Sequence, residues 1–333
     1  MFATLMLLLL AGGMNGSFTL PMKYVRGWQW EHTWLVWSLL GMLLLPLAVG
    51  FSTIPNLTLV YHAAGFHSLM RTIIYGMLWG IGAILFGLGI TRVGLAVGFG
   101  IILGTSSLIG TVVPLVLRHR DRLFTASGFV TLAGLSVMLT GVAACALAGR
   151  VREAAMQQCS RHGSFTAGLV ICLLSGVGSA SMSMALNESA PISRAAESFG
   201  VPQAILMNAV WPVLLGGGVI VNAAFCAYLI LRNGNIALFA KSAGLNAGLA
   251  AAMALLWSGS NYVYAAGARS MGSLGLVLGW PIFMAAIVLT ANGWGLLTGE
   301  WRGAGRTAAR WAAIGCLLLI LGIGIIASSG GSS

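Results

Sequence analysis

The charged residues of this chain lie far apart, and the stretches between them are long and apolar. About 20 apolar residues in a helix cross the hydrocarbon core of a bilayer. A charge at the bilayer centre costs about 2.5–3.5 kcal/mol, so charges mark the ends of such helices. The pattern therefore predicts ten transmembrane helices. The stretches of 20 residues or more without Lys, Arg, Asp or Glu are 1–22, 32–70, 72–91, 93–117, 123–149, 162–187, 198–231, 242–268, 270–299 and 311–333.

The stretch 32–70 is longer than one span needs. We expect a helix near 33–51, followed by a polar connection from Ser52 to Ser68 that contains His62 and His67. A β-barrel would instead alternate in polarity over segments of about 10 residues, and runs such as Leu-Leu-Leu-Ile-Leu at 317–321 do not alternate. The first stretch lacks the basic region of a signal peptide and is expected to be the first helix.

Composition supports the same class of protein. Hydrophobic residues make up 58% of the chain and charged residues 7%, against about 25% charged in soluble domains. This excludes a soluble globular fold and a disordered chain. The net charge of +11 is explained by basic residues in cytoplasmic loops, without nucleic acid. Six Lys and Arg residues fall on the side of the termini and eleven on the other side, which places both termini outside the cytoplasm. The basic cluster at 118–122 favours the opposite orientation.

A polar segment divides the predicted spans into five and five. We expect a first five-helix repeat at 1–149, a cytoplasmic linker at 150–163, a second repeat at 164–328 and a disordered tail at 329–333. A shift of 178 residues superposes Leu78-Trp79 on Leu256-Trp257.

An odd number of spans per repeat makes the second copy inverted in the membrane, an arrangement typical of alternating-access transporters. The predicted fold is thus an all-α membrane protein with two inverted repeats. The other interpretation of the duplication is a purely structural bundle.

A transporter of this kind binds its solute near the midplane, between the repeats. Neutral amides, hydroxyls and aromatic faces inside the spans suit an uncharged, polyhydroxylated solute. The other interpretation of each residue is an interhelical hydrogen bond or an anchor at the membrane interface. The candidate binding residues are Asn15, Lys23, Trp79, Ser183, Asn187, Trp257, Asn261, Tyr264 and Trp280.

No acidic residue lies in the middle of a predicted span. Glu31, just before the second helix, and Glu188, at the end of the sixth, are the nearest candidates for proton coupling. The sequence offers no enzyme site, because the single Asp121 lies in a loop and all five histidines lie outside the predicted spans. It contains no P-loop and no CxxC pair, so we expect neither metal nor cofactor.

Several short motifs resemble one known family. Leu20-Pro21-Met22-Lys23, followed by Trp28-x-Trp30-Glu31, resembles the first loop of the L-rhamnose–proton symporter family, in the drug/metabolite transporter superfamily. Further matches occur in the same order at 78–82, 181–187, 216–222 and 299–305.

The resemblance implies a ten-helix permease of the bacterial inner membrane that imports a neutral sugar with protons. Apolar residues at 83–85 and 274–281 depart from the family pattern and leave the identity of the sugar open. A facilitator or exporter of another small neutral metabolite, or a non-transporting membrane protein with this fold, is the alternative.

Overall fold

The computed structural model of the protein describes residues 2–93, 95–118, 120–155, 165–272, 275–299 and 301–329. These residues are helical almost throughout, and no strand occurs among them, which confirms the predicted all-α class. The long helices are α1 Phe2–Ser17, α5 Phe66–Val93, α6 Leu95–Arg118, α8 Ala126–Ala155, α9 Phe165–Glu188, α11 Trp211–Asn233, α12 Ala243–Arg269, α13 Gly275–Leu297 and α14 Gly305–Ser329. The shorter helical elements are η1 Leu20–Tyr24, α2 Trp30–Ser38, η2 Leu39–Leu44, α3 Leu45–Thr53, α4 Leu57–Ala64, α7 Arg120–Leu123, α10 Ala190–Ser198, η3 Gln203–Ala209 and η4 Ile236–Ala240.

Nine helical segments within the described residues are long and apolar enough to cross a membrane. They correspond to nine of the ten predicted spans. One of them, Trp30–Thr53, joins α2, η2 and α3 into a continuous helical rod. The tenth predicted span, 242–268, is the 27-residue helix α12, which is long enough to cross but less apolar. Its buried face carries polar side chains, among them Asn246, Ser258, Ser260 and Asn261.

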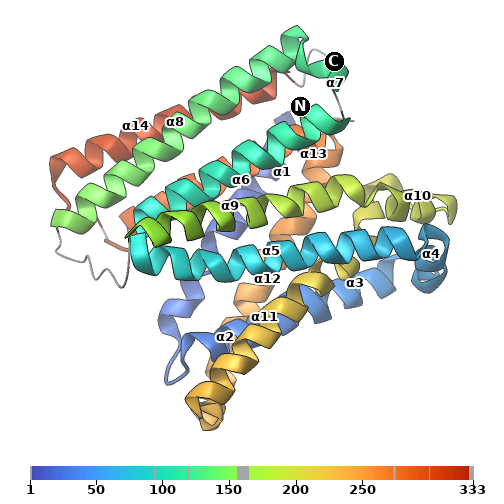
Figure 1. The fold of residues 1–333 in the computed structure, drawn as a ribbon, viewed down its shortest axis with the longest axis horizontal. Helices are drawn as coiled ribbons and strands as arrows, with labels where there is room; N and C mark the ends of the chain where they lie inside the picture. The colour runs from blue at the N-terminus through green and yellow to red at the C-terminus, as the bar shows by residue number, and fades with distance from the viewer. Residues whose placement is uncertain are drawn as a thin grey trace.

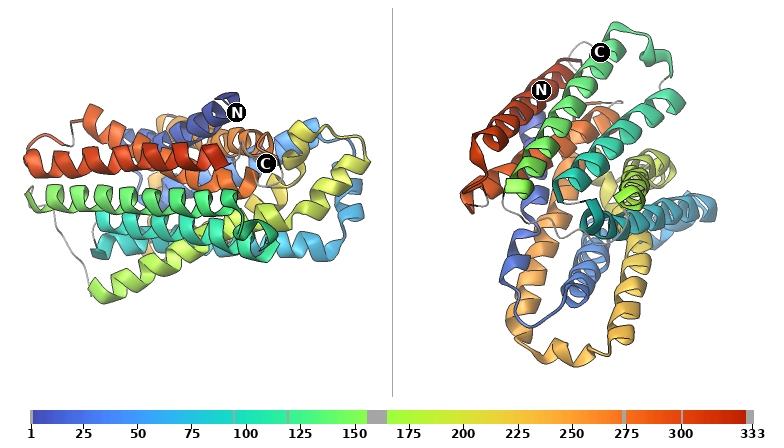
Figure 2. Two further views of the ribbon diagram at one scale, coloured as in Figure 1. Left: turned by 90° about the horizontal axis from the view of Figure 1, so that it is seen from above. Right: turned by 60° about the vertical axis from the view of Figure 1, so that its left-hand side comes forward.

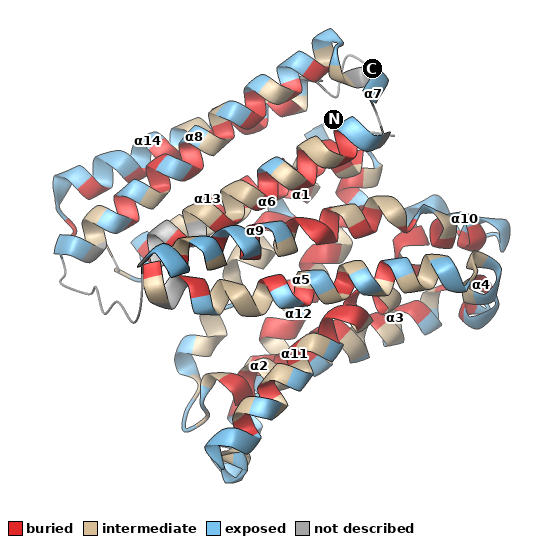
Figure 3. Cartoon of the chain, in the orientation of Figure 1, coloured by how far each residue is buried: buried red, intermediate tan, exposed pale blue. Residues whose placement is uncertain are grey.

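The long helices form one bundle in which α8 and α14 lie side by side along one edge (Figures 1 and 2). α5 packs against α9 and α11, while α1 packs against α12 and α13. α13 is the most enclosed of the nine segments, with 72% of its span buried. The colouring by burial shows this contrast, because α8 and α14 keep exposed outer faces (Figure 3). The two termini lie at the same end of the bundle (Figure 1).

Small residues bring the helix backbones together. A Cβ atom added at Gly82 of α5 would lie 2.7 Å from the carbonyl carbon of Gly178 in α9. A Cβ added at Gly141 of α8 would lie 2.9 Å from a backbone nitrogen of α14, at Leu319. In lipid, where apolar side chains supply no driving force for association, such close approach gives the packing energy.

The structure corrects two local expectations. The connection predicted at 52–68 contains the short helix α4, so His62 lies in a helix, and His67 lies in the first turn of α5; both side chains are exposed. Arg71 lies within α5 and not before it. The part of the predicted linker at 156–163 and the part of the tail at 330–333 lie outside the described residues.

The second predicted span contains an irregular turn. Residues Leu39–Leu44 form a π-helical turn, and the N–H of Leu45 bonds to the carbonyl of Leu40, five residues earlier. Pro46 follows directly. Because proline has no N–H and its ring crowds the carbonyl four residues before it, the regular α-helical pattern is lost here.

Candidate functional site

Two tryptophans predicted from the sequence repeat meet at the centre of the bundle. Trp79, halfway along α5, stacks on Trp257, halfway along α12, with ring centroids 5.4 Å apart and ring planes at 27°. Trp257 is buried and Trp79 is half-buried. The two tryptophans that the shift of 178 residues superposes are thus in contact with each other, at mid-length of the helices that carry them.

The aromatic cluster continues along one face of α2. Trp37 meets Trp257 edge-on, at 5.1 Å and 74°. The ring centroids of Trp34 and Trp37 lie 4.4 Å apart, and Trp30 stacks on Trp34 with ring centroids 5.0 Å apart. The spacing of three and four residues puts these α2 side chains on one helix face. We call Trp30, Trp34, Trp37, Trp79 and Trp257 the tryptophan row.

Amide side chains flank this row. The Trp34 indole N–H donates to Oδ1 of Asn222 at 2.9 Å, and Nδ2 of Asn222 donates to the Gly218 carbonyl of its own helix, α11. Asn261, one turn after Trp257, donates to the Trp257 carbonyl at 3.0 Å. Hydrogen-bonding groups thus lie directly beside broad aromatic faces, the combination that recognises a sugar ring.

Asn15 joins the same region from α1. Its Nδ2 donates to Oγ of Ser260 at 2.9 Å, and Ser260 donates to the Trp257 carbonyl. Asn15 of α1 is thus linked to the turn of α12 that carries Trp257 and Asn261, while Trp79 of α5 stacks on the Trp257 ring.

A second group of predicted residues uses its hydrogen-bond donors on neighbouring backbone. The Tyr264 hydroxyl donates to the Leu276 carbonyl, and the Trp280 indole N–H donates to the Ser106 carbonyl. Ser183 donates to the Gly110 carbonyl at 2.8 Å. These three side chains are buried, and the bonds tie α12, α13 and α9 to adjacent helices. As binding residues they stay predictions.

The remaining predicted residues lie toward the ends of the bundle. Lys23 is exposed on η1, after the end of α1. Asn187 is half-buried near the end of α9 and donates to the Ser183 carbonyl one turn earlier.

Glu31 is a buried carboxylate in a polar cluster that links the two halves of the chain. It is 6% exposed, and its Oε1 accepts hydrogen bonds from Nδ2 of Asn233 at 3.2 Å and from Nδ2 of Asn235 at 2.9 Å. His32, fully buried, places its Nε2 3.1 Å from the Asn235 carbonyl. Nearby, Asn246 bonds both the N–H and the carbonyl of Arg26. We call Glu31, His32, Asn233, Asn235, Asn246 and Arg26 the Glu31 cluster.

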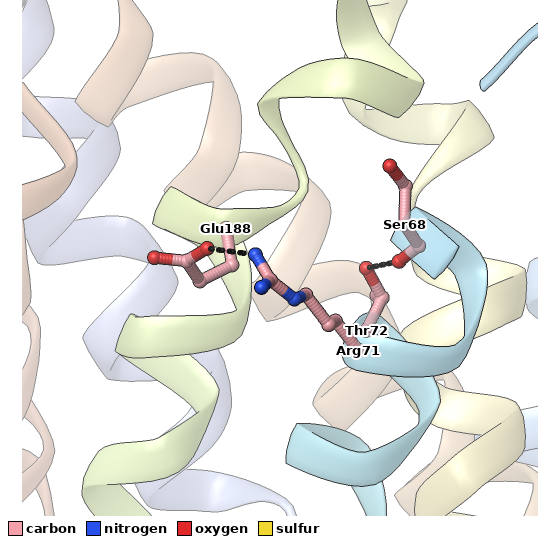
Figure 4. Close-up of polar contacts among 4 residues, drawn as sticks. All are labelled: Ser68, Arg71, Thr72 and Glu188. Atoms are coloured by element: carbon pink, nitrogen blue, oxygen red, sulfur yellow. Dashed lines mark hydrogen bonds and ion pairs between the residues drawn. The ribbon is translucent and has the colours of Figure 1, made fainter. Parts of the chain in front are cut away.

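Glu188 has different surroundings. Its Oε2 lies 3.9 Å from a guanidinium nitrogen of Arg71 on α5, and the two side chains are 21% and 56% exposed (Figure 4). In the same turn of α5, the buried Thr72 hydroxyl donates to the Ser68 carbonyl at 2.9 Å (Figure 4). The pair joins the start of α5 to the end of α9 and gives Glu188 a cation partner.

The other end of α11 has its own polar contacts between the halves. Nδ2 of Asn208 donates to Oγ1 of Thr53 at 3.0 Å, and the Tyr61 hydroxyl donates to the Ala209 carbonyl at 3.0 Å. Burial raises the pKa of the Tyr61 phenol, so this hydroxyl stays a donor. These contacts and the Glu31 cluster are separated by the length of α11, about 35 Å.

The sequence interpretation missed Trp34, Trp37 and Asn222. Trp30 precedes Glu31 in the sequence and stacks on Trp34. The spacing of Trp30, Trp34 and Trp37, which puts them on one helix face, was the available signal. Asn222 gave no such signal, because a single amide in an apolar helix also fits a bond between helices.

Comparison with known proteins identifies the family. The family model described as L-rhamnose-proton symport protein (RhaT) matches residues 2–331. The chain belongs to this family. The L-rhamnose-proton symporter of Cronobacter sakazakii is 30% identical over 326 residues, covering 96% of this chain and 94% of the relative. The L-rhamnose-proton symporter of Escherichia coli strain SMS-3-5 is also 30% identical over 326 residues, with 96% and 95% covered.

Membership confirms the family indicated by the short motifs. Together with the nine apolar segments, it identifies the chain as a multi-pass protein of the bacterial inner membrane. As a RhaT-family protein it is placed among transporters. Within the described residues, no three His, Cys, Asp or Glu side chains gather as ligands for a metal ion.

Proposed function

We propose that this RhaT-family chain imports L-rhamnose or a related monosaccharide, together with protons, by alternating access. The observation that carries the proposal is the stack of Trp79 on Trp257, with the Asn261 amide one turn further along α12 and Asn15 linked to the same turn through Ser260. The indole faces would cover the apolar face of a sugar ring, and the amides would pair with its hydroxyls. The two relatives described above are both named L-rhamnose-proton symporters, which supports this choice of cargo.

We further propose that the fold consists of two inverted five-helix repeats with α12 as the tenth span. The contacts between helices support this. By their order in the two halves, α1 corresponds to α9, α5 to α12, α6 to α13 and α8 to α14. Under this correspondence the contact between α5 and α9 has its counterpart between α12 and α1, and the contact between α6 and α9 has its counterpart between α13 and α1. The contact between α6 and α8 likewise has its counterpart between α13 and α14. An inverted pair of repeats would give related inward-open and outward-open arrangements, as expected of the drug/metabolite transporter-like fold proposed here.

Proton coupling is assigned to Glu31, with Glu188 as the second candidate. Glu31 is buried and holds together segments from both halves through Asn233 and Asn235. Adding a proton to this carboxyl removes the charge that strengthens both bonds. Protonation would therefore loosen the contact between the halves at this end of the bundle. Glu188, by contrast, already has Arg71 as a partner.

The proposal is tested by uptake into membrane vesicles. With an inside-alkaline pH gradient, vesicles containing the protein should accumulate labelled L-rhamnose above the external concentration. A proton ionophore should reduce this to equilibration, and vesicles without the protein serve as the control. The expectation rests on the gradient as the energy source, since the chain contains no P-loop for ATP.

Three other outcomes identify the alternatives. Equilibration that is insensitive to the gradient would indicate a facilitator. Accumulation only when the gradient is reversed would indicate an exporter. No movement of L-rhamnose or of a panel of neutral monosaccharides, by folded protein, would leave a non-transporting membrane protein with this fold and would contradict the proposal.

The inverted repeats predict opposite orientations for α5 and α12. A reporter fused after Val93, at the end of α5, should face the cytoplasm. One fused after Arg269, at the end of α12, should face the periplasm, in keeping with the larger number of basic residues on the Arg92 side. A fusion after Arg118 should report the same side as the fusion after Arg269. If the ends of α5 and α12 face the same compartment, the repeats are not inverted.

A further inference from the structure

The Trp37 side chain carries a buried hydrogen-bond donor without a partner. Its ring is 1% exposed, and Nε1 makes no hydrogen bond. Three other indoles do form such a bond: Trp34 bonds Asn222, Trp280 bonds the Ser106 carbonyl and Trp294 bonds Ser17. A buried donor without an acceptor destabilises the arrangement that holds it. In this conformation the indole N–H of Trp37 therefore has no hydrogen-bond acceptor.

The place of Trp37 in the tryptophan row indicates what that acceptor is. Its ring meets Trp257 edge-on and stacks on Phe18 at 5.5 Å and 29°. Trp257 in turn stacks on Trp79. A sugar ring seated on Trp257 would have its hydroxyl oxygens next to the Trp37 edge. Trp28, Trp211 and Trp301 also have an unpartnered buried N–H. Their rings lie outside the tryptophan row: Trp211, in the first turn of α11, packs on Tyr262 of α12, Trp28 packs on Phe239, and the Arg152 guanidinium lies over Trp301.

An irregular backbone turn lies close to Trp37. The π-helical turn Leu39–Leu44 begins two residues later and separates α2, with its tryptophans, from α3. Irregular turns of this kind are frequent at functional sites and are points where a helix bends. Ser258 of α12 donates to the Gly41 carbonyl, so the turn is also in contact with the helix that carries Trp257.

We propose that Trp37 is a specificity-determining residue whose indole N–H donates to one hydroxyl of the transported sugar. The inference rests on the proposed sugar transport. Bending at Leu39–Leu44 moves the edge of Trp37 away from Trp257 and admits the sugar between them. The sugar oxygen then supplies the acceptor that is missing in its absence. A sugar without that hydroxyl leaves the donor unpaired and is rejected, because a polar site discriminates strongly against an analogue that cannot bond to it.

The test compares L-rhamnose with three analogues that each lack the hydroxyl at C2, C3 or C4, measured as competition for uptake by the wild-type protein and by Trp37→Phe. One analogue should bind the wild type about tenfold more weakly than L-rhamnose, as expected for one lost hydrogen bond. In Trp37→Phe, the affinity for L-rhamnose should fall by about the same factor. The affinity for that one analogue should not fall below its wild-type value. If the variant acted only through its smaller ring, it would weaken the binding of all four sugars alike and leave their ratios as in the wild type.

The control is Trp294→Phe, which removes an indole N–H that bonds Ser17 at 2.7 Å between α13 and α1. It should leave the ratios among the four sugars as in the wild type. If Trp37→Phe is not folded, Trp37→Met carries the same comparison, since the flexible thioether fills irregular space without an N–H donor. Wild-type ratios in the Trp37 variant would overturn the inference while leaving the proposed transport intact. Failure of the wild type to take up any sugar would instead contradict the proposed function.

Discussion

Glu31→Gln should lose the ability to accumulate L-rhamnose against its gradient while still letting the sugar equilibrate. Both amide donors, on Asn233 and Asn235, bond the same carboxylate oxygen, Oε1. The carbonyl oxygen of glutamine can still accept both bonds, so the variant should fold, but the cluster stays in its neutral, more weakly bonded state and can no longer take up or release a proton. A difference of one pH unit supports about tenfold accumulation per proton. The variant should therefore fall from about tenfold to onefold in gradient-driven vesicle uptake.

Glu188→Gln is the comparison for this experiment. Its pair with Arg71 is partly exposed, and such pairs contribute about 0–1 kcal/mol to stability. This variant should fold and accumulate the sugar as the wild type does. Loss of accumulation in Glu188→Gln alone would move proton coupling to that residue. Normal accumulation by both variants would exclude both carboxylates.

Gly76→Ala should prevent α5 from packing against α11. A Cβ atom at this position would overlap the carbonyl oxygen of Leu214 and lie 3.4 Å from Cα of Gly217. The obstacle is backbone, which cannot rotate away as a side chain can, so the helices must separate. We expect a loss of about 3 kcal/mol, at the upper end of overpacking effects. Thermal unfolding of the purified protein in detergent measures it.

The matched control is Gly87→Ala on the same helix, where an added Cβ has nothing within 4 Å. Alanine in a helix is favoured over glycine by about 0.5–1 kcal/mol. This variant should unfold at the same temperature as the wild type or higher. Equal stability of the two variants would mean that α5 and α11 do not touch at Gly76.

The sequence predicted most helices because charges are so costly inside a bilayer. The predicted span 242–268 matches α12, Ala243–Arg269, and 162–187 matches α9, Phe165–Glu188, to within a few residues. The rule failed locally at Arg71, because α5 begins before this residue and includes it. A long arginine side chain near a helix end can reach the polar surface, so the charge does not end the helix. It gave no information on α4 and α10, which are too short to cross a membrane.

The centre of the candidate site was predictable and its surroundings were not. The shift of 178 residues pairs Trp79 with Trp257 in the sequence, and the two rings stack on each other in the structure. Whether a polar group packs or binds depends on tertiary contacts, so Tyr264 and Trp280 looked like binding residues although their donors bond backbone carbonyls. The π-helical turn follows from Pro46, but a proline inside a span predicts only a disturbed helix and not the form of the disturbance.

The packing of α1 has a consequence for how the chain is made. Its main neighbours among the described helices are α12 and α13. Asn15 bonds Ser260, 245 residues further on, and Ser17 accepts a bond from Trp294. Helix α1 thus leaves the ribosome long before α12 and α13 and finds these partners only after they have been made. Until then α1 lacks its main neighbours, so the packing of this helix is completed late in the assembly of the bundle.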